Sequence, residues 1–176
     1  QNFSAYDLVN TASERELEQI IRGYGEEPAA RRIARAIAAH RKTAPLKTTA
    51  ELAALIAKSV PRTHGRRKIH PATKTFQALR IAVNRELASL AQAIETGTGL
   101  LRNSGRFSII SFHSLEDRIV KHAFSAREGR CVCPPDFPRC VCQPVATLNV
   151  LTKKPVRPGA EEIAANLRAR SARLRT

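Results

Sequence analysis

The sequence predicts an α/β fold, because an apolar run ends abruptly and a helical pattern follows it. The run Phe107–Phe112 is short and unbroken, which is typical of a strand buried on both faces. Leu115, Ile119 and Ala123 then recur every four residues and give a helix one apolar face. The apolar fraction of 43% is ample for a core. We therefore expect part of an α/β sheet, preceded by a helical insert.

Three helices are predicted within residues 7–60. Ser13 is expected to cap the first, with Glu16 as its capping-box partner. The second starts with Pro28 in its first turn. The third is expected to be capped by Thr48, with Glu51 as its partner. The second helix displays Arg31, Arg32, Arg35 and Arg41. These arginines either lie on nucleic acid or form a solvated face with i,i+4 ion pairs, and both interpretations stay open.

A basic loop and a long helix come next. The loop Arg62–His70 is typical of a hinge that contacts phosphates. The apolar stripe of Ala72–Ile94 predicts one continuous helix. Polar residues gather at its N-terminal end, where free amides and the helix dipole favour an anion: His70, Thr73, Lys74, Thr75, Gln77 and Arg80. The alternative is ordinary capping, which needs Thr73 alone.

A second polar group follows the predicted strand Phe107–Phe112. It comprises His113, Ser114, Glu116, Asp117 and Arg118. Ser114 is predicted to cap the following helix, with Asp117 as its capping-box partner. Because ligands bind past the carboxyl ends of strands in open α/β sheets, these side chains are candidates for a site. The alternative is that each of them only satisfies local hydrogen bonds.

Four cysteines lie in one proline-rich loop, residues 131–142. Cys131, Cys133, Cys140 and Cys142 form a C-x-C pair, a six-residue gap and a second C-x-C pair. Four thiolates can hold zinc tetrahedrally, although the spacing differs from the usual C-x-x-C knuckle. Four reduced surface thiols are the alternative.

The C-terminal segment is predicted to hold a strand, a short helix and an edge strand. These elements are expected at Val145–Thr152, Glu161–Leu167 and Arg170–Arg175.

Charge and composition limit the possible partners. Lys and Arg number 30 against 15 Asp and Glu, a formal charge of +15, which indicates a polyanionic partner. No apolar run approaches the ~20 residues of a membrane span, so no membrane partner is expected. Clustered cysteines favour a cytoplasmic location. The start at Gln1 and the absence of Met predict the C-terminal part of a longer protein.

Several long runs resemble the MraW/RsmH family of bacterial methyltransferases. They are KIHPATKTFQALRIAVNREL (Lys68–Leu87), ISFHSLEDRIVK (Ile110–Lys121), LTKKPVRP…ARSARLR (Leu151 to Arg175) and VNTASERELEQIIRGYGEE (Val9–Glu27). The resemblance implies the C-terminal half of a class I (Rossmann-like) methyltransferase sheet with a helical insert domain. We expect the insert at residues 1–66 and the half-sheet at residues 67–176. No stretch matches the family's glycine-rich donor loop, and Leu167 stands where the family usually has Pro.

The resemblance also implies an activity. The family methylates N4 of a cytosine in small-subunit ribosomal RNA, with S-adenosylmethionine as donor. This chain would supply mainly the RNA-facing part, so its partner would be that RNA or the small ribosomal subunit. Arg66, Arg67 and Lys68 are expected to contact phosphate, His70, Thr73, Thr75, Gln77 and Arg80 to line the pocket, and His113, Ser114, Asp117 and Arg118 to lie nearest the chemistry. The catalytic base is unassigned, with His113 the candidate by residue type. The alternative is a non-enzymatic, basic helical module that binds nucleic acid.

The basic loop yields a first prediction. Replacing Arg66, Arg67 and Lys68 together with Ala should flatten the salt dependence of RNA binding, with the log–log slope falling by about 2 if all three contact phosphates. Fluorescence anisotropy across a salt series measures the slope. An unchanged slope would remove this loop from the interface.

Overall fold

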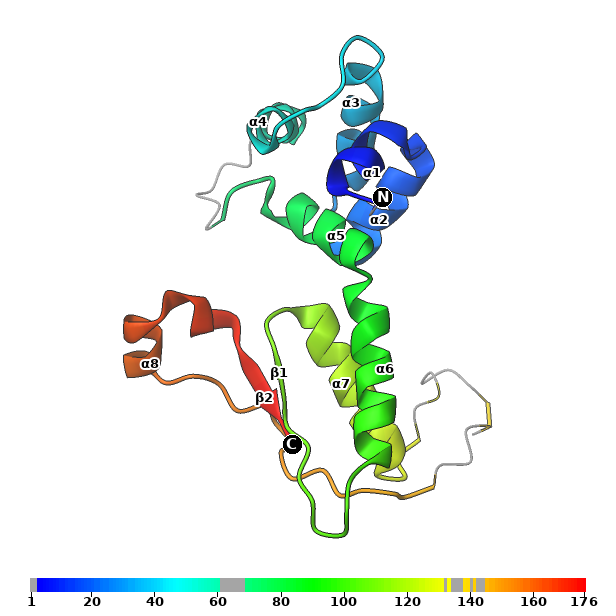
Figure 1. The fold of residues 1–176 in the computed structure, drawn as a ribbon, viewed down its shortest axis with the longest axis vertical. Coiled ribbons are helices and arrows are strands. Elements are labelled where there is room, and N and C mark those ends of the chain that lie inside the picture. The colour runs from blue at the N-terminus through cyan, green and yellow to red at the C-terminus, as the bar shows by residue number, and fades with distance from the viewer. Residues whose placement is uncertain (1–2, 61–68, 132, 134–137, 140, 142–144) are drawn as a thin grey trace. The chain divides into compact units, whose positions relative to one another are not determined.

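The computed structural model describes residues 3–60, 69–131, 133, 138–139, 141 and 145–176 (Figure 1). The chain forms two compact units, Gln1–Glu86 and Leu87–Thr176. The observed division falls after Glu86 rather than after residue 66, because the helix that begins at Thr73 packs with the first unit. A functional division at residue 66 stays a prediction. None of the described helices combines the length and apolar composition that a bilayer crossing requires.

The first unit is a bundle of five described helices. They are α1 (Ala5–Thr11), α2 (Glu14–Gly25), α3 (Ala30–His40), α4 (Thr49–Ser59) and α5 (Thr73–Asn84). The predicted capping boxes at Ser13 and Thr48 are confirmed. Helix α1 was not expected, although Ser4 and Asp7 form the same kind of box at its start.

The core of this unit lies between α2, α3, α4 and α5. Leu17 and Ile21 of α2, Ile33 and Ile37 of α3 and Ile56 of α4 are fully buried. Each such side chain stabilises the fold by about 1.5–3 kcal/mol. These residues belong to the apolar stripe of each helix, although Tyr24 on the stripe of α2 is 37% exposed.

The helix predicted at Ala72–Ile94 is wrong as one continuous element. Helix α5 ends at Asn84, and α6 (Glu86–Gly99) begins after Arg85, which is left-handed with a φ of 53°. A non-glycine residue in this conformation interrupts the helical hydrogen bonds without any sequence signal. The Arg80 guanidinium spans the break and pairs with both carboxylate oxygens of Glu86, at 2.9 and 3.0 Å.

The second unit joins α6 to one further long helix and two short strands (Figure 1). The remaining elements are β1 (Ile109–Ser111), α7 (Ser114–Arg127), α8 (Ala160–Ala165), the 3₁₀ helix η1 (Leu167–Ser171) and β2 (Arg173–Arg175). Its small core contains Ile94 of α6 with Val120 and Phe124 of α7. The Phe107 and Phe124 rings lie 6.3 Å apart between centroids, within the range of aromatic pairing.

Strands β1 and β2 are antiparallel, with Ile110 opposite Leu174. The expectation that Phe107–Phe112 is buried on both faces is wrong, since Ile110 is 58% exposed and Phe112 is 53% exposed. Successive strand residues point to opposite faces, and among the described residues no element covers the second face.

The predicted strand at Val145–Thr152 is also wrong. Among the described residues, Ala146 forms only an isolated bridge with Glu128. The extended residue beside β2 is instead Val156, whose amide and carbonyl both bond Leu174. Pro155 and Pro158 flank this bridge, and because proline has no amide hydrogen the pairing extends no further. The predicted edge strand at Arg170–Arg175 is confirmed only from Arg173 onward.

Close packing of α2 on α5 yields a second prediction. A Cβ added at Gly25 would lie 2.7 Å from the Lys74 carbonyl oxygen, whereas a Cβ at Gly23 meets nothing within 4 Å. Gly25→Ala should therefore destabilise the first unit by about 1–3 kcal/mol. Gly23→Ala, in the same helix, should stabilise it by about 0.5–1 kcal/mol. Urea unfolding measures both, and equal effects would contradict the close approach.

Candidate nucleic-acid interface

The start of α7 is capped by His113. Its backbone is extended (φ −139°, ψ 169°), and its Nδ1 accepts a hydrogen bond from the Glu116 amide at 3.3 Å. A Glu116 carboxylate oxygen in turn accepts from the amides of Phe112 and His113, at 2.7 and 3.2 Å. The predicted capping box of Ser114 and Asp117 is therefore wrong. The box forms one residue earlier because an imidazole can accept a bond as a hydroxyl does.

Both ring nitrogens of His113 face groups at the start of its own helix. With Nδ1 accepting from an amide, neutral His113 carries its proton on Nε2, which lies 3.4 Å from a Glu116 carboxylate oxygen. The side chain is only 9% exposed. This geometry gives His113 a capping role, and its role as catalytic base stays a prediction.

The Asp117 carboxylate binds two arginines of β2. One oxygen accepts from Arg175 Nε at 2.7 Å, and the other accepts from Arg173 at 2.9 Å and from Arg175 at 3.3 Å. Asp117 and Arg175 are both 7% exposed. The Arg175 guanidinium, helped by Arg173, holds the pKa of the Asp117 carboxyl below its usual range against the opposing effect of burial. Asp117 thus fastens the last strand to α7.

The sequence interpretation missed these two arginines as partners of Asp117. They stand two residues apart in a strand, and such residues share one face. The alternation Arg173, Leu174, Arg175 thus carried a signal that both guanidiniums point the same way. The sequence did not indicate which acid pairs with these arginines, because Asp117 lies 58 residues from Arg175 in the chain.

The polar residues at the start of α5 do not all reach the surface. Thr73 and Arg80 are exposed and Gln77 is half-buried on the same face, since their spacing is that of successive turns. Thr75 is fully buried, and no described residue bonds its hydroxyl. His70 accepts from the Ala72 amide at 3.2 Å, while Thr73 makes no side-chain cap.

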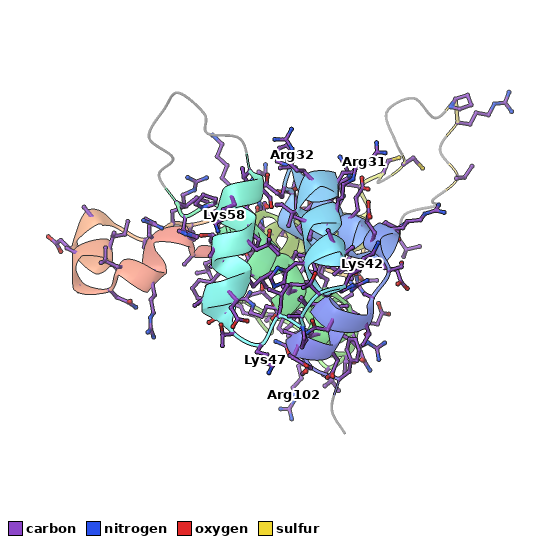
Figure 2. All side chains as sticks on the ribbon, turned by 90° about the horizontal axis from the view of Figure 1, so that it is seen from above. Arg31, Arg32, Lys42, Lys47, Lys58 and Arg102 are labelled. Carbon is purple, nitrogen blue, oxygen red and sulfur yellow. The ribbon has the colours of Figure 1, made fainter. Side chains whose placement is uncertain are left out.

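The four arginines of the second predicted helix separate into two kinds. Arg41 donates to the Val9 carbonyl at 2.8 Å, and Arg35 lies 3.8 Å from a Glu14 carboxylate oxygen. Arg31 and Arg32 are exposed on α3 (Figure 2), and no described residue bonds or pairs with either. Only these last two remain available to a partner. Neither contact of the other two is an i,i+4 ion pair, so that interpretation is not confirmed, and contact of Arg31 and Arg32 with nucleic acid stays a prediction.

Several predicted residues lie outside the described part of the chain. They are Arg66, Arg67, Lys68, Cys140 and Cys142. Of the other two cysteines, Cys131 is exposed and Cys133 is half-buried. Two of four ligands are insufficient to assess a tetrahedral site, so zinc stays a prediction. Ser114 is half-buried and Arg118 is exposed.

These observations define a basic, mainly helical protein with a small two-stranded sheet, whose exposed arginines suit a polyanion. The chain belongs to the MraW methylase family, whose model matches residues 1–176. It is 57% identical to ribosomal RNA small subunit methyltransferase H of Syntrophus aciditrophicus over 173 residues, which cover 98% of this chain and 55% of that protein. Identity is 50% to the protein of that name from Clostridium botulinum (strain Loch Maree), covering 99% and 56%. Identity is 53% to the protein of that name from Geobacter sulfurreducens, and the match covers 98% of this chain and 55% of that protein.

The buried ion pair yields a third prediction. Asp117→Ala leaves Arg175 buried without its counter-ion, so the free energy of unfolding of the second unit should fall by about 3–5 kcal/mol. Glu95→Ala is the matched control, because Glu95 pairs with Arg127 at 2.5 Å but is 79% exposed. Its effect should stay within about 1 kcal/mol. Urea unfolding measures both variants. Equal losses of unfolding free energy in Asp117→Ala and Glu95→Ala would contradict the importance of burial.

The same pair should make stability sensitive to acid. Because the folded-state pKa of Asp117 is lowered, its contribution is complete above the unfolded value near ~3.9 and is lost as the pH falls through the folded-state value. Asp117→Asn removes this titrating group. The difference between wild-type and Asp117→Asn stability should therefore shrink below about pH 4, and a constant difference would show that Asp117 does not titrate this way.

Proposed function

We propose that this chain is the RNA-facing part of an S-adenosylmethionine-dependent methyltransferase that modifies N4 of a cytosine in small-subunit ribosomal RNA. The observation that carries the proposal is family membership over the whole chain, with relatives named ribosomal RNA small subunit methyltransferase H. The chain spans about 55% of the length of the relatives it matches. We assign the donor-binding residues to the part of the relatives that this chain does not span.

The second unit supports a role as part of a larger class I sheet. Among the described residues only β2 pairs with β1, so the other edge of β1 offers unpaired backbone groups. The exposed side chains of Ile110 and Phe112 lie on the face that nothing described covers. A strand added at this edge, together with a helix over β1, would bury Ile110, while Phe112 lies beyond the end of β1 and would stay exposed. We infer that the region of the relatives that this chain does not span provides these elements.

The first unit supports a role as the helical substrate-recognition insert. Arg31 and Arg32 extend from α3 toward solvent, and Lys58 of α4 is likewise exposed (Figure 2). Phosphate contacts of this kind give affinity and fix orientation without reading sequence. Arg66, Arg67 and Lys68 belong to the same proposed function. The exposed face of α5 with Thr73, Gln77 and Arg80 is a second proposed RNA contact.

Methyl transfer requires the protein to align the methyl donor with the cytosine. Bound S-adenosylmethionine supplies a methyl group on a sulfonium. The chain's own residues must present an unstacked cytosine and exclude water around its amine. We propose that the start of α7, with His113, Ser114 and Arg118, lies beside this base. Asp117 acts there through Arg173 and Arg175, which it holds in place.

The alternative is a basic module that binds nucleic acid without catalysis. It is not favoured, because a methylase family model matches the entire chain. A zinc ion in the cysteine loop is a separate proposal on which no catalytic step depends.

A chimera tests the proposal. This chain is fused after the N-terminal segment of the Syntrophus aciditrophicus relative that it does not cover, and is then incubated with tritiated S-adenosylmethionine and small ribosomal subunits. Nucleoside mass spectrometry should find N4-methylated cytosine. This chain alone should give no heat on titration with the donor, and the chimera should bind it. A folded chimera that binds RNA but methylates nothing would favour the non-enzymatic module, whereas donor binding by this chain alone would overturn our assignment of the donor site.

A further inference from the structure

A hollow of about 320 Å³ lies within the second unit, in front of the turn between β1 and α7. Its volume is at the low end of the ~300–1,000 Å³ range of ligand sites. The side chains that carry the argument are Phe112, His113, Ser114, Arg157, Arg170 and Arg173. They come from three segments that are distant in sequence, and the bridge of Val156 to Leu174 brings the segment of Arg157 beside β2.

The lining carries positive charge that the described residues do not neutralise. Arg157 and Arg170 are exposed, and neither forms an ion pair or side-chain hydrogen bond with a described residue. Arg173 does pair with Asp117, but Asp117 is shared with Arg175. The nearest acid on α7, Glu116, turns back onto the amides of Phe112 and His113. Three arginines therefore line one hollow, and no acidic residue is among those that line it.

This arrangement differs from that of two other arginines of the same unit. Arg127 pairs with Glu95, and Arg130 pairs with Glu128. Acids are thus within reach of arginines elsewhere in this unit but do not line the hollow. The hollow also adjoins the N-terminal end of α7, which His113 and Glu116 already cap, so the arginines rather than the helix supply the positive charge.

The chemistry of the lining suits one kind of ligand. Guanidinium groups bind phosphate oxygens with paired, charge-assisted hydrogen bonds. Phe112 places a half-exposed aromatic ring at the same hollow, and rings of this kind stack on unpaired bases. A phosphate beside a base is a nucleotide.

We propose that this hollow binds one nucleotide of single-stranded RNA, with Arg157, Arg170 and Arg173 on its phosphate and the Phe112 ring against its base. The inference rests on the proposed function, and it adds a defined nucleotide-binding site next to the proposed catalytic edge. It also gives Asp117 a purpose beyond stability. By holding Arg173, Asp117 limits the conformations of one of the three phosphate-binding side chains.

Binding of a short single-stranded RNA to the chain of residues 1–176 tests this site. Arg157→Ala with Arg170→Ala should weaken binding at least about tenfold and reduce the salt slope by about 1.4. Neither residue has a described partner, so the thermal unfolding midpoint should not change. Arg102→Ala is the matched control, because Arg102 is an exposed arginine of the same unit without a described side-chain partner (Figure 2). It should change affinity less than about twofold at ~0.15 M salt.

Two further variants separate geometry from net charge. Arg157→Lys with Arg170→Lys should restore the salt slope but not the affinity, since lysine lacks the planar fork that grips phosphate. Phe112→Leu should weaken RNA binding while leaving competition by inorganic phosphate unchanged. If inorganic phosphate competes with RNA but Phe112→Leu leaves the RNA affinity unchanged, the hollow is a simple anion site. That result would overturn the proposal that it binds a nucleotide.

The remaining outcomes separate this site from the proposed function. Equal losses in the double variant and in Arg102→Ala would mean diffuse charge, and would overturn the site. Unchanged RNA affinity in the double variant would also overturn the site, while methylation by the chimera would leave the proposed function intact. Failure of the chimera to methylate, with RNA affinity still dependent on Arg157 and Arg170, would overturn the function and leave a nucleotide-binding site.

Discussion

The buried contact of Asp117 with Arg175 is the interaction on which the second unit most depends. This unit has few fully buried apolar side chains and only two three-residue strands, so its hydrophobic core by itself fixes little of the C-terminal segment. One carboxylate on α7 binds both guanidiniums of β2 and thereby sets where the last strand lies. Removing one partner of such a pair leaves an unpaired buried charge, which is why the contact holds β2 against α7.

The identity of the N-cap is what makes Asp117 available for this contact. Had Asp117 turned back to cap the helix, its oxygens would have faced backbone amides at the start of α7. His113 and Glu116 take that role one residue earlier, and Asp117 points to β2 instead. A shift of one residue in a helix turns a side chain by about 100°, since each turn holds about 3.6 residues. The ion pair of Asp117 with β2 therefore depends on the cap at His113.

The positive charge of this chain has two uses that composition cannot distinguish. Arg41 and Arg175 stabilise the fold, because their guanidiniums satisfy a backbone carbonyl and a buried carboxylate. Arg31 and Arg157 have no described partner and face solvent. The surplus relevant to a polyanion is thus smaller than the formal charge of +15 and is placed at particular surfaces.

Local features and the family could be predicted from the sequence. Capping boxes at Ser13 and Thr48 and the strand-to-helix switch near His113 were predictable, because each depends on residues within a turn or two of one another. Long motifs in order were enough to indicate the methylases. Tertiary structure alone decided the break at Arg85, the partner of Val156 and the pairing of Asp117 with Arg175. Those depend on which distant segments meet, and a periodic pattern carries no information about that.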